Sequence, residues 1–405
     1  MATNKEQNKL NVPHLRFPEF HGEWEEHGLS EYLDFKNGLN PDSKRFGKGI
    51  KFISVMDILN NPVITYDCIR ASVQATDAEM SSFSVENGDI LFQRSSETLE
   101  DVGRANVYID DKVAVFGGFV IRGKKKANYN PLFFRYLLSS PYARKRIIPM
   151  GAGAQHFNIG QEGLSKVLLN FPSIEEQTKI ASLLHLLDER IATQSKLIED
   201  LKKLKSAIID YAINSLDTNF AKFGSLYEMA GEGGTPTTSN ASFYDNGNIP
   251  FIKIDDLKQK YLTENKDFIT ELGLQKSSAW LVPTHSILFS NGATIGEISI
   301  TTYPVCTKQG ILGIVPMQNI DVEFLYYFMS SSYFKKAVSR IVTEGTMKTA
   351  YLKDINNILC PIPTKEKQQE IAKMPSTLNS KIDFEQSILK LFCSQKQYLL
   401  RQMFI

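Results

Sequence analysis

Polar side chains gather in glycine-containing loops that follow short apolar runs, once in each half of the sequence. Lys and Arg can hold phosphate oxygens, while Ser, Thr, Asn, Gln and His can share hydrogen bonds with base edges. The first half contributes Lys44, Arg45, Arg94, Ser95, Arg104, Gln155 and His156. The second half contributes Thr235, Lys253, Ser290, Asn291, Thr294, Lys308, Gln309, Thr346 and Lys348. Their joint placement at strand ends predicts two DNA-contacting surfaces, although each cluster taken singly can also be a solvated face.

The sequence patterns of common catalytic sites are missing. There is no G-x-x-x-x-G-K-[ST] phosphate loop, no H-E-x-x-H zinc motif and no G-x-S-x-G nucleophile turn. The run that starts at Gly151 is glycine-rich but does not join a strand to a helix in a βαβ unit, which favours a flexible connector over a dinucleotide site. The four cysteines lack metal-ligand spacing, so we expect reduced, buried thiols.

Composition limits the class of protein. A chain of 405 residues with 42% apolar residues can form two or three packed domains. The net charge of +1 gives no support for a uniformly basic nucleic-acid binder, so local patches must decide that function. The polar N-terminus is no signal peptide, and no apolar run reaches the roughly 18 to 20 residues of a membrane span. We therefore expect a cytoplasmic protein.

One stretch occurs twice and organises the chain. The first copy begins at Pro172 and reads Pro-Ser-Ile-Glu-Glu-Gln-Thr-Lys-Ile-Ala, and the second begins at Pro363 and reads Pro-Thr-Lys-Glu-Lys-Gln-Gln-Glu-Ile-Ala. Each opens a long segment whose apolar residues recur at helical spacing. A repeated element that closes each half of a chain indicates a duplicated module.

The two long segments are expected to be helices that pack against each other. Residues 174 to 213 carry an apolar stripe with no partner nearby in the sequence, and an antiparallel pairing with the second segment would bury both stripes. Pro375 lies where Leu184 stands in the first copy. Since proline removes a helical hydrogen bond, we expect the second helix to break near Met374 and to restart with Ser376 as its N-cap.

The remaining segments repeat the same frame. Strands are expected at residues 50–55, 89–92 and 113–121, the last broken by Gly117-Gly118, and a helix is expected at 131–138. Counterparts of these segments lie at 249–257, 286–289 and 324–331. The aromatic-rich piece from Leu15 to Trp24 is expected to pack on the first domain. The predicted fold is α+β: two similar mixed domains separated by a long antiparallel two-helix coiled coil, with an internal pseudo-two-fold repeat. Its parts are a disordered tail (1–12), domain 1 (13–171), a central helix (172–215), domain 2 (216–362) and a C-terminal helix (363–405).

Taken together, these features resemble the specificity subunit of Type I restriction-modification enzymes. The resemblance covers nearly the whole chain. It rests on Leu15-Arg-Phe-Pro-Glu-Phe with Trp24, on Gly233-Gly-Thr-Pro, on both repeated helix starts and on the terminal Gln402-Met-Phe. The sequence departs from the family pattern at Pro375 and at Gly38-Leu-Asn-Pro, which stands in for the first Gly-Gly-Thr-Pro turn.

The resemblance implies a non-catalytic DNA reader. Each target recognition domain would read one half of a split, asymmetric sequence in double-stranded DNA, and the helices would set the spacer and dock two methyltransferase subunits. Restriction subunits would join through the complex, and S-adenosylmethionine, ATP and magnesium would belong to the partner subunits. Six residues at the helix starts are predicted to dock partners, although their charges also suit a helix N-terminus: Glu175, Gln177, Ile180, Glu366, Gln368 and Ile371.

Two other functions remain open from the sequence. A self-contained nuclease or methyltransferase would need a clustered acidic or cofactor-binding set, which the sequence lacks. A scaffold that binds only proteins would use the same domains without any preference for a DNA sequence. Footprinting separates the scaffold from the DNA reader, and turnover by the purified chain alone would identify an enzyme.

Overall fold

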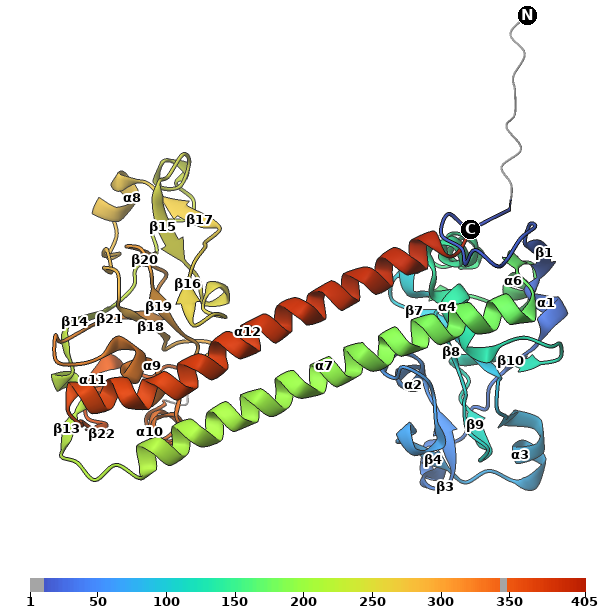
Figure 1. Ribbon diagram of the computed structural model, residues 1–405, viewed down its shortest axis with the longest axis horizontal. Helices are drawn as coiled ribbons and strands as arrows, with labels where there is room; N and C mark the ends of the chain where they lie inside the picture. Colours follow the sequence, from blue (N-terminus) through green and yellow to red (C-terminus); the bar gives the residue numbers. More distant parts are fainter. Residues whose placement is uncertain (1–10, 343–347) are drawn as a thin grey trace, which may run out of the picture. The chain divides into compact units, whose positions relative to one another are not determined.

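The computed structural model describes residues 11–342 and 348–405. The predicted tail at 1–12 lies outside the described residues except for its last two positions, and so does the predicted site residue Thr346. The chain forms two compact units (Figure 1). Unit 1 joins the chain up to Ser195 with the segment from Ile388, and unit 2 spans Lys196–Ser387.

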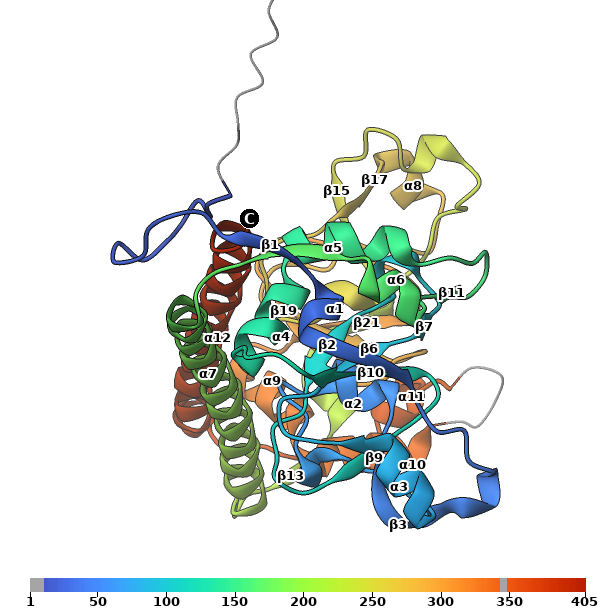
Figure 2. The same ribbon diagram turned by 90° about the vertical axis from the view of Figure 1, so that its right-hand side faces the viewer.

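Unit 1 is built on an antiparallel sheet in the order β2-β10-β6-β8. All residues of β6 are buried, because α4 and the apolar core cover it from one side and a second sheet, β4-β3-β9-β5, adjoins it (Figure 2). The bounds are β2 (Leu33–Asn37), β3 (Phe46–Ile53), β4 (Ser72–Val73), β5 (Ser84–Val85), β6 (Ile90–Gln93), β8 (Ala105–Val107), β9 (Ala114–Phe116), β10 (Val120–Lys125) and α4 (Pro131–Ser139). Strands lie at the expected places 50–55 and 89–92 and the helix at 131–138, whereas the segment expected as one strand at 113–121 holds two, β9 and β10, which belong to different sheets.

Smaller elements complete unit 1. Strand β1 pairs with β12 beside the start of the long helix, and β7 pairs with β11. The bounds are β1 (Glu25–Gly28), α1 (Leu29–Tyr32), α2 (Val55–Asn60), α3 (Asp77–Phe83), β7 (Ser95–Ser96), α5 (Pro141–Ile147), β11 (Phe157–Asn158), α6 (Gln161–Ser165) and β12 (Leu168–Phe171). As predicted, the segment from Leu15 to Trp24 packs on this unit, with Trp24 2% exposed in its core.

Unit 2 repeats this plan with its own details. Its main sheet has the order β14-β21-β18-β19-β16, and a smaller sheet has the order β17-β15-β20. The strand bounds are β13 (Phe220–Lys222), β14 (Tyr227–Glu232), β15 (Ile249–Ile252), β16 (Tyr261–Leu262), β17 (Asp267–Ile269), β18 (Ile287–Ser290), β19 (Ile298–Thr301), β20 (Cys306–Thr307), β21 (Ile311–Pro316) and β22 (Leu359–Pro361). The shorter helices are α8 (Glu271–Gln275), α9 (Val322–Ser330), α10 (Ser332–Ile341) and α11 (Leu352–Ile355).

Matching caps begin the helices that cover the two main sheets. The Asn130 side chain accepts a hydrogen bond from the Phe133 N–H at the start of α4, and Asp321 does the same for Phe324 in α9. Asn130 and Asp321 are 191 positions apart, like the repeated helix starts. Side-chain caps satisfy N–H groups that have no partner inside a helix. Equivalent sequence positions therefore fold in the same way in both units.

The two long helices are α7 (Ile174–Asn214), at the predicted place, and α12 (Lys365–Gln402). In unit 1, Lys396 of α12 forms an ion pair of 2.5 Å with Asp188 of α7. In unit 2, the Lys205 Nζ of α7 donates a hydrogen bond of 2.8 Å to the Asn379 Oδ1 of α12. These contacts join residues in opposite chain directions, so the helix segments within each unit run antiparallel and side by side (Figure 1).

The predicted break in the second helix is wrong. Helix α12 continues through Pro375, which is buried against unit 2. Ser376 caps no helix; its hydroxyl donates a hydrogen bond to Glu323 and accepts one of 3.0 Å from Lys260. Packing on unit 2 thus stabilises the turn whose hydrogen bond the proline nitrogen cannot make.

All four cysteines are free, but only Cys306 and Cys360 are buried as expected. Cys68 is half-buried and Cys393 is exposed, so the prediction of buried thiols is wrong for these two. Cys393 lies on a face of α12 that contacts neither core. Within residues 11–342 and 348–405, no helix has the length and apolarity that a membrane crossing requires.

Candidate nucleic-acid interface

In unit 1 the structure brings four of the predicted residues to one loop cluster. The β7–β11 pairing places Ser95 opposite Asn158, next to the exposed Gln155 and His156. The Arg94 backbone carbonyl accepts a hydrogen bond of 2.9 Å from Ile159, which fixes the loop that carries Arg94. The cluster therefore combines one guanidinium with several neutral donors and acceptors, which suits contacts to both phosphates and bases.

An exposed aromatic residue joins this cluster. Phe119 is 69% exposed, and its carbonyl accepts a hydrogen bond of 2.9 Å from the Arg94 N–H. The Arg94 guanidinium donates to the Gly118 carbonyl at 3.2 Å in the same turn. The sequence reasoning did not name Phe119, although the expected break at Gly117-Gly118 was a signal of the turn that presents it. Aromatic side chains at such positions can stack on bases.

Lys44 and Arg45 lie in a short 3-10 helix (Ser43–Arg45) just before β3. Arg45 is half-buried and donates to Glu79 at 3.0 Å and to the Gln74 carbonyl at 2.6 and 2.8 Å. Its guanidinium, with the Thr76 N–H, lowers the pKa of Glu79 to about 2. Arg45 thus ties the start of β3 to α3. Lys44 is exposed, and no carboxylate among the described residues lies within ion-pair distance of it.

The backbone of Arg104 pairs with Gln93, and its side chain lines a pocket of about 460 Å³ together with Arg135 and Arg144. Arg104 is exposed and pairs with Asp101 at 2.6 Å. Burial lowers the pKa of Arg144 to about 10, and the nearby positive charge of Arg104 acts in the same direction. Three guanidinium groups therefore line this recess, although Arg135 is paired with Asp188 at 3.2 Å.

In unit 2 most of the predicted residues converge on the loop after β18. Ser290 is fully buried and its hydroxyl donates to the Thr294 carbonyl at 2.6 Å, which leaves the Thr294 side chain exposed at the loop tip. Asn291 is buried, with its amide donating to the Ala350 carbonyl at 3.2 Å. Ala293 adopts φ 54°, a left-handed conformation that costs a non-glycine residue energy. Ser290 and Asn291 therefore shape the loop, and Thr294 is presented by it.

The other unit 2 residues border the same loop. The Gln309 N–H donates to the Thr235 hydroxyl at 3.3 Å, and the Asn291 N–H donates to the Gly310 carbonyl at 3.0 Å. Lys308 is exposed and its N–H donates to Ile252, the residue before Lys253. Lys253 is tied to Asp267 by an ion pair of 2.8 Å. Hydrogen bonds and neighbouring positions in the chain thus connect the described members of the second predicted set other than Lys348.

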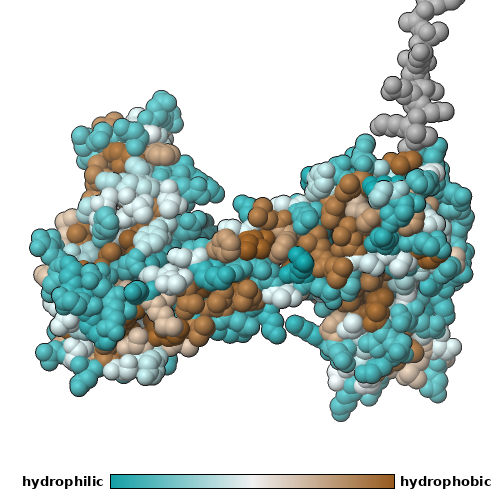
Figure 3. Space-filling view, viewed as in Figure 1, coloured by the Kyte–Doolittle hydropathy of each residue, from teal (hydrophilic) through white to brown (hydrophobic). Residues whose placement is uncertain are grey.

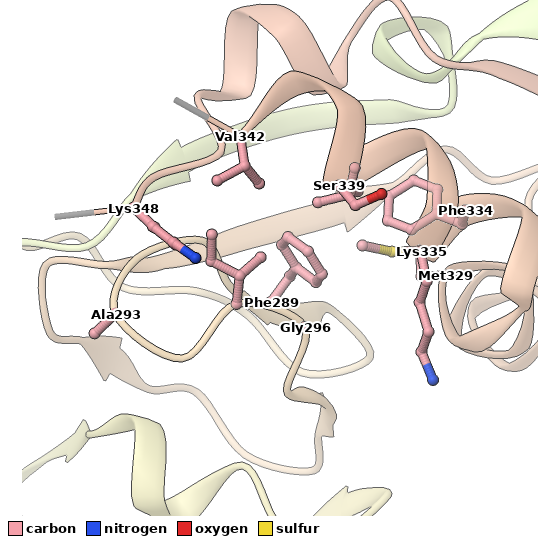
Figure 4. Close-up of a pocket in the computed structure, with 11 residues that line it drawn as sticks. Phe289, Ala293, Gly296, Met329, Phe334, Lys335, Ser339, Val342 and Lys348 are labelled. Atoms are coloured by element: carbon pink, nitrogen blue, oxygen red, sulfur yellow. The ribbon is translucent and has the colours of Figure 1, made fainter. Parts of the chain in front are cut away.

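Lys348 borders a pocket of about 460 Å³ beneath this loop. Phe289, Phe334 and Met329 line the apolar interior, and Lys348 reaches toward it from one side (Figure 4). No carboxylate among the described residues lies within ion-pair distance of Lys308 or Lys348, so both ammonium groups are available to an anion. Contact of either residue with DNA stays a prediction.

The two loop clusters are held by the same backbone contact. In unit 1 the Ile159 N–H donates to the Arg94 carbonyl at 2.9 Å, and in unit 2 the Ala350 N–H donates to the Asn291 carbonyl at 2.8 Å. Ile159 and Ala350 are 191 positions apart. The two units therefore use the same backbone frame to hold loops that differ in length and in side chains. Such loops suit two sites that differ in what they bind.

The predicted partner-docking residues divide by exposure. Gln177 and Gln368 are buried, and each bridges its own unit: Gln177 accepts from Asn130 N–H at 3.1 Å and donates to the Pro172 carbonyl at 3.0 Å. Gln368 makes the matching bonds to Asp321 and Pro363, at 2.8 and 2.9 Å. Ile180 is buried and Ile371 half-buried, while Glu175 and Glu366 are exposed. Partner docking by this set stays a prediction.

The sequence reasoning also missed the function of Glu176, which is 1% exposed. Arg16 donates to both its carboxylate oxygens, at 2.8 and 2.7 Å, and the Trp24 indole donates at 3.3 Å. The signal was present, since Arg16 and Trp24 belong to the aromatic-rich segment expected to pack on this domain. Within the described residues, no group of three or more His, Cys, Asp or Glu side chains could hold a metal ion.

Comparison with known proteins identifies the family. The family model of the Type I restriction modification DNA specificity domain matches residues 21–203 and 217–391. The HindI specificity subunit of Haemophilus influenzae is 22% identical over 408 residues, which covers 80% of this chain and 86% of the relative. The S subunit from M. genitalium has a TM-score of 0.57 at 17% identity and covers 97% of this chain and 99% of that one.

A chain from a structure of the type I restriction-modification system, concerned with complex assembly and conformational transition, has a TM-score of 0.59 at 14% identity, with coverage of 93% and 96%. At these identities the two structural matches establish the two-domain α+β fold. The family model matches each of two successive segments and together they span most of the chain. The chain therefore belongs to the specificity subunits of Type I restriction-modification enzymes.

Proposed function

We propose that this chain reads a bipartite, asymmetric sequence in double-stranded DNA, one half with the loops of each unit. The observation that carries the proposal is the repeated frame with unequal contents: the family model matches twice, and the same backbone contact holds an Arg94 loop in one unit and an Asn291 loop in the other. The Arg94 guanidinium favours guanine, whereas the exposed Thr294 hydroxyl can bond to more than one base, so the two loops would select different half-sites.

The long helices are proposed to set the spacer between the half-sites, related by a pseudo-two-fold axis, and to dock two methyltransferase subunits. Helix α7 has 41 residues, about 60 Å at 1.5 Å per residue, enough to span half-sites about one DNA turn apart. Exposed apolar residues recur every seven positions at Leu197, Leu204 and Tyr211 on α7, and at Phe384, Leu391 and Tyr398 on α12. Figure 3 shows apolar surface along the long helices, and exposed apolar residues at this spacing suit the packing of partner helices.

Catalysis is proposed to reside in partner subunits. In the assembled complex, methyltransferase subunits would supply S-adenosylmethionine, and restriction subunits would use ATP and Mg²⁺. The chain would contribute the choice of sequence. Its net charge of +1 is compatible with this task if the partners supply much of the attraction to phosphates.

Exchange of one unit's reading loops tests the proposal. We expect replacement of residues 28–150 by the equivalent segment of another family member to change one half of the methylated sequence in cells that also carry the methyltransferase subunit. Sequencing of methylated bases across the genome gives the readout. A change in both halves, or methylation without sequence preference, would refute the assignment of one half-site to each unit.

The spacer is tested by lengthening both helices. In unit 2, the Lys205–Asn379 contact sets position 200 opposite position 384 in the antiparallel register. Seven residues inserted after Asp200 and after Phe384 should keep the helix faces aligned and add about 10 Å, or about three base pairs, to the recognised spacer. An unchanged spacer would show that the helices do not set this distance.

A further inference from the structure

A groove of about 590 Å³ opens in unit 2 between the end of α7 and the start of α12. Tyr211 and Met374 on its rim are 77% and 59% exposed, which is unusual for large apolar side chains. Six of the residues that line the groove carry the argument below: Ile208, Tyr211, Pro363, Lys367, Glu370 and Met374. No described segment of unit 2 covers these apolar side chains.

The equivalent place in unit 1 is filled by the chain itself. A shift of 191 positions converts Pro363, Lys367 and Glu370 into Pro172, Glu176 and Lys179, and it converts Tyr211 into Gln402. The anchor segment, residues 11–24, lies there without a helix or strand. The Leu15 N–H donates to the Gln402 carbonyl at 2.8 Å, and the Trp24 and Phe404 rings lie 6.3 Å apart.

Two charged contacts hold the anchor segment in place. Arg16 binds the Glu176 carboxylate at 2.8 and 2.7 Å, and the Glu19 carboxylate accepts a hydrogen bond of 2.6 Å from Lys179. The Lys179 ammonium also lies 5.3 Å from the centre of the Phe17 ring. The occupant of unit 1 thus presents a cation, an aromatic ring and then an anion.

In unit 2 the two charges of the groove are reversed. Lys367 stands where unit 1 has Glu176, and Glu370 stands where unit 1 has Lys179. With no occupant, they pair with each other at 2.9 Å while remaining 51% and 68% exposed, so the pair contributes little and either charge can turn to a partner. This reversal disfavours the anchor segment of a second copy, whose Arg16 would meet an ammonium group.

We propose that the unit 2 groove binds a non-helical segment of a methyltransferase subunit that presents a carboxylate to Lys367, a cation to Glu370 and an aromatic or aliphatic side chain to Tyr211 and Met374. The proposal rests on the proposed function, because the methyltransferase is the partner named there. The charge order is the reverse of Arg16 and Glu19, and the apolar contact replaces the cover that Phe17 and Trp24 give to unit 1.

Photo-crosslinking in the assembled complex tests the occupant. With p-benzoylphenylalanine at Tyr211 of the full chain, we expect a covalent product with the methyltransferase subunit, mapped by mass spectrometry to a segment with the stated charges. The same probe at Gln402, the counterpart in unit 1, should react within the chain, with residues 11–24. Reaction at Tyr211 with a second copy of the chain would overturn the proposal.

A charge exchange tests the recognition. The double variant K367E/E370K keeps the internal ion pair and should weaken binding of the methyltransferase subunit by about tenfold. Exchange of the two charges in the crosslinked segment should restore binding. The matched control is E162K/K166E, which reverses an exposed ion pair on α6 of unit 1, away from the long helices, and should leave binding unchanged.

The failures of the two proposals are distinguishable. If the complex forms and protects a split DNA site but Tyr211 gives no crosslink, or if K367E/E370K binds as the wild type does, the groove assignment is wrong and the proposed function stands. If neither a complex nor sequence-specific protection is obtained, the proposed function fails and the groove assignment falls with it.

Discussion

Each unit is joined to the start of its long helix by the hydrogen bonds of one buried glutamine, Gln177 or Gln368, here called the glutamine clamp. The charged contacts beside this clamp differ between the two units. Gln177 and Gln368 make matching hydrogen bonds, whereas Glu176 of unit 1 corresponds to Lys367 of unit 2 and Asp188 corresponds to Asn379. The glutamine clamp holds the helix start on the sheet domain in the same way in both units. The charged differences decide what covers each helix end: the anchor segment in unit 1 and, as proposed, a partner segment in unit 2.

The largest expected difference between the units lies at Glu176. Glu176→Ala should destabilise unit 1 by about 3 kcal/mol, because it leaves the Arg16 guanidinium and the Trp24 indole without their buried acceptor. Urea unfolding, followed through Trp24 in unit 1 and Trp280 in unit 2, measures each unit separately. Lys367→Ala is the matched control and should change the stability of unit 2 by less than about 0.5 kcal/mol. Equal effects would contradict the comparison.

The second expected effect is the same in both units. Gln177→Leu and Gln368→Leu should each cost about 2 kcal/mol, because each leaves a backbone N–H and a proline carbonyl without a partner in a buried place. The loss should be confined to the unit that carries the change, again followed by its own tryptophan. If only one of the two variants were destabilised, the glutamine clamp would not contribute equally to the stability of both units.

Acid should distinguish the units at Asp188. Burial alone would raise the pKa of this carboxyl, but hydrogen bonds and charges from Lys396, Tyr136 and Arg135 outweigh it and hold the pKa below its ordinary value. A lowered pKa in the folded state stabilises unit 1 above about pH 4, the ordinary value, and this contribution is lost as the pH falls through the folded value.

Asp188→Asn should therefore cost about 1 to 2 kcal/mol at pH 7 and reduce the acid sensitivity of unit 1. Unfolding by urea at pH 7 and at pH 3 measures both effects, with Ser182→Ala on the exposed face of α7 as the control. An undiminished loss of stability in acid would mean that other carboxylates dominate. Unit 2 has Asn379 at the equivalent place and lacks this source of acid sensitivity.

Much of the frame could be predicted from the sequence, because it depends on local patterns. The repeated stretches predicted α7 and the start of α12, and the apolar runs predicted β6, β18 and α4. Pro375 was misjudged because helix propensity is local, whereas the burial of this proline on unit 2 is a tertiary effect. Cys393 was misjudged for the same reason, since its exposure depends on which helix face meets the core.

The candidate site was harder to predict than the frame. The polar loop residues were found by their type, but type does not distinguish Arg45, engaged with Glu79, from Lys44, which faces solvent. Asn291 was predicted to contact DNA, and the structure uses its amide to hold Ala350. The same residue types occur among the side chains that hold a loop in shape and among those that the loop exposes. Only the path of the backbone decides which of the two a given residue does.

The smallest expected effect is that of Asn379→Asp, and it concerns why unit 2 has an asparagine where unit 1 has Asp188. Asn379→Asp would give Lys205 a charged partner as in unit 1, but Asn379 also donates to Asp383 at 3.0 Å, and a carboxylate there would be repelled. We expect the two effects to cancel within about 0.5 kcal/mol. Unit 1 has Ala192 at the position of Asp383, so Asp188 meets no such repulsion. The double variant N379D/D383A should therefore stabilise unit 2 by about 1 kcal/mol by urea unfolding, whereas D383A alone should not. Stabilisation by N379D alone would show that Asp383 does not determine the difference.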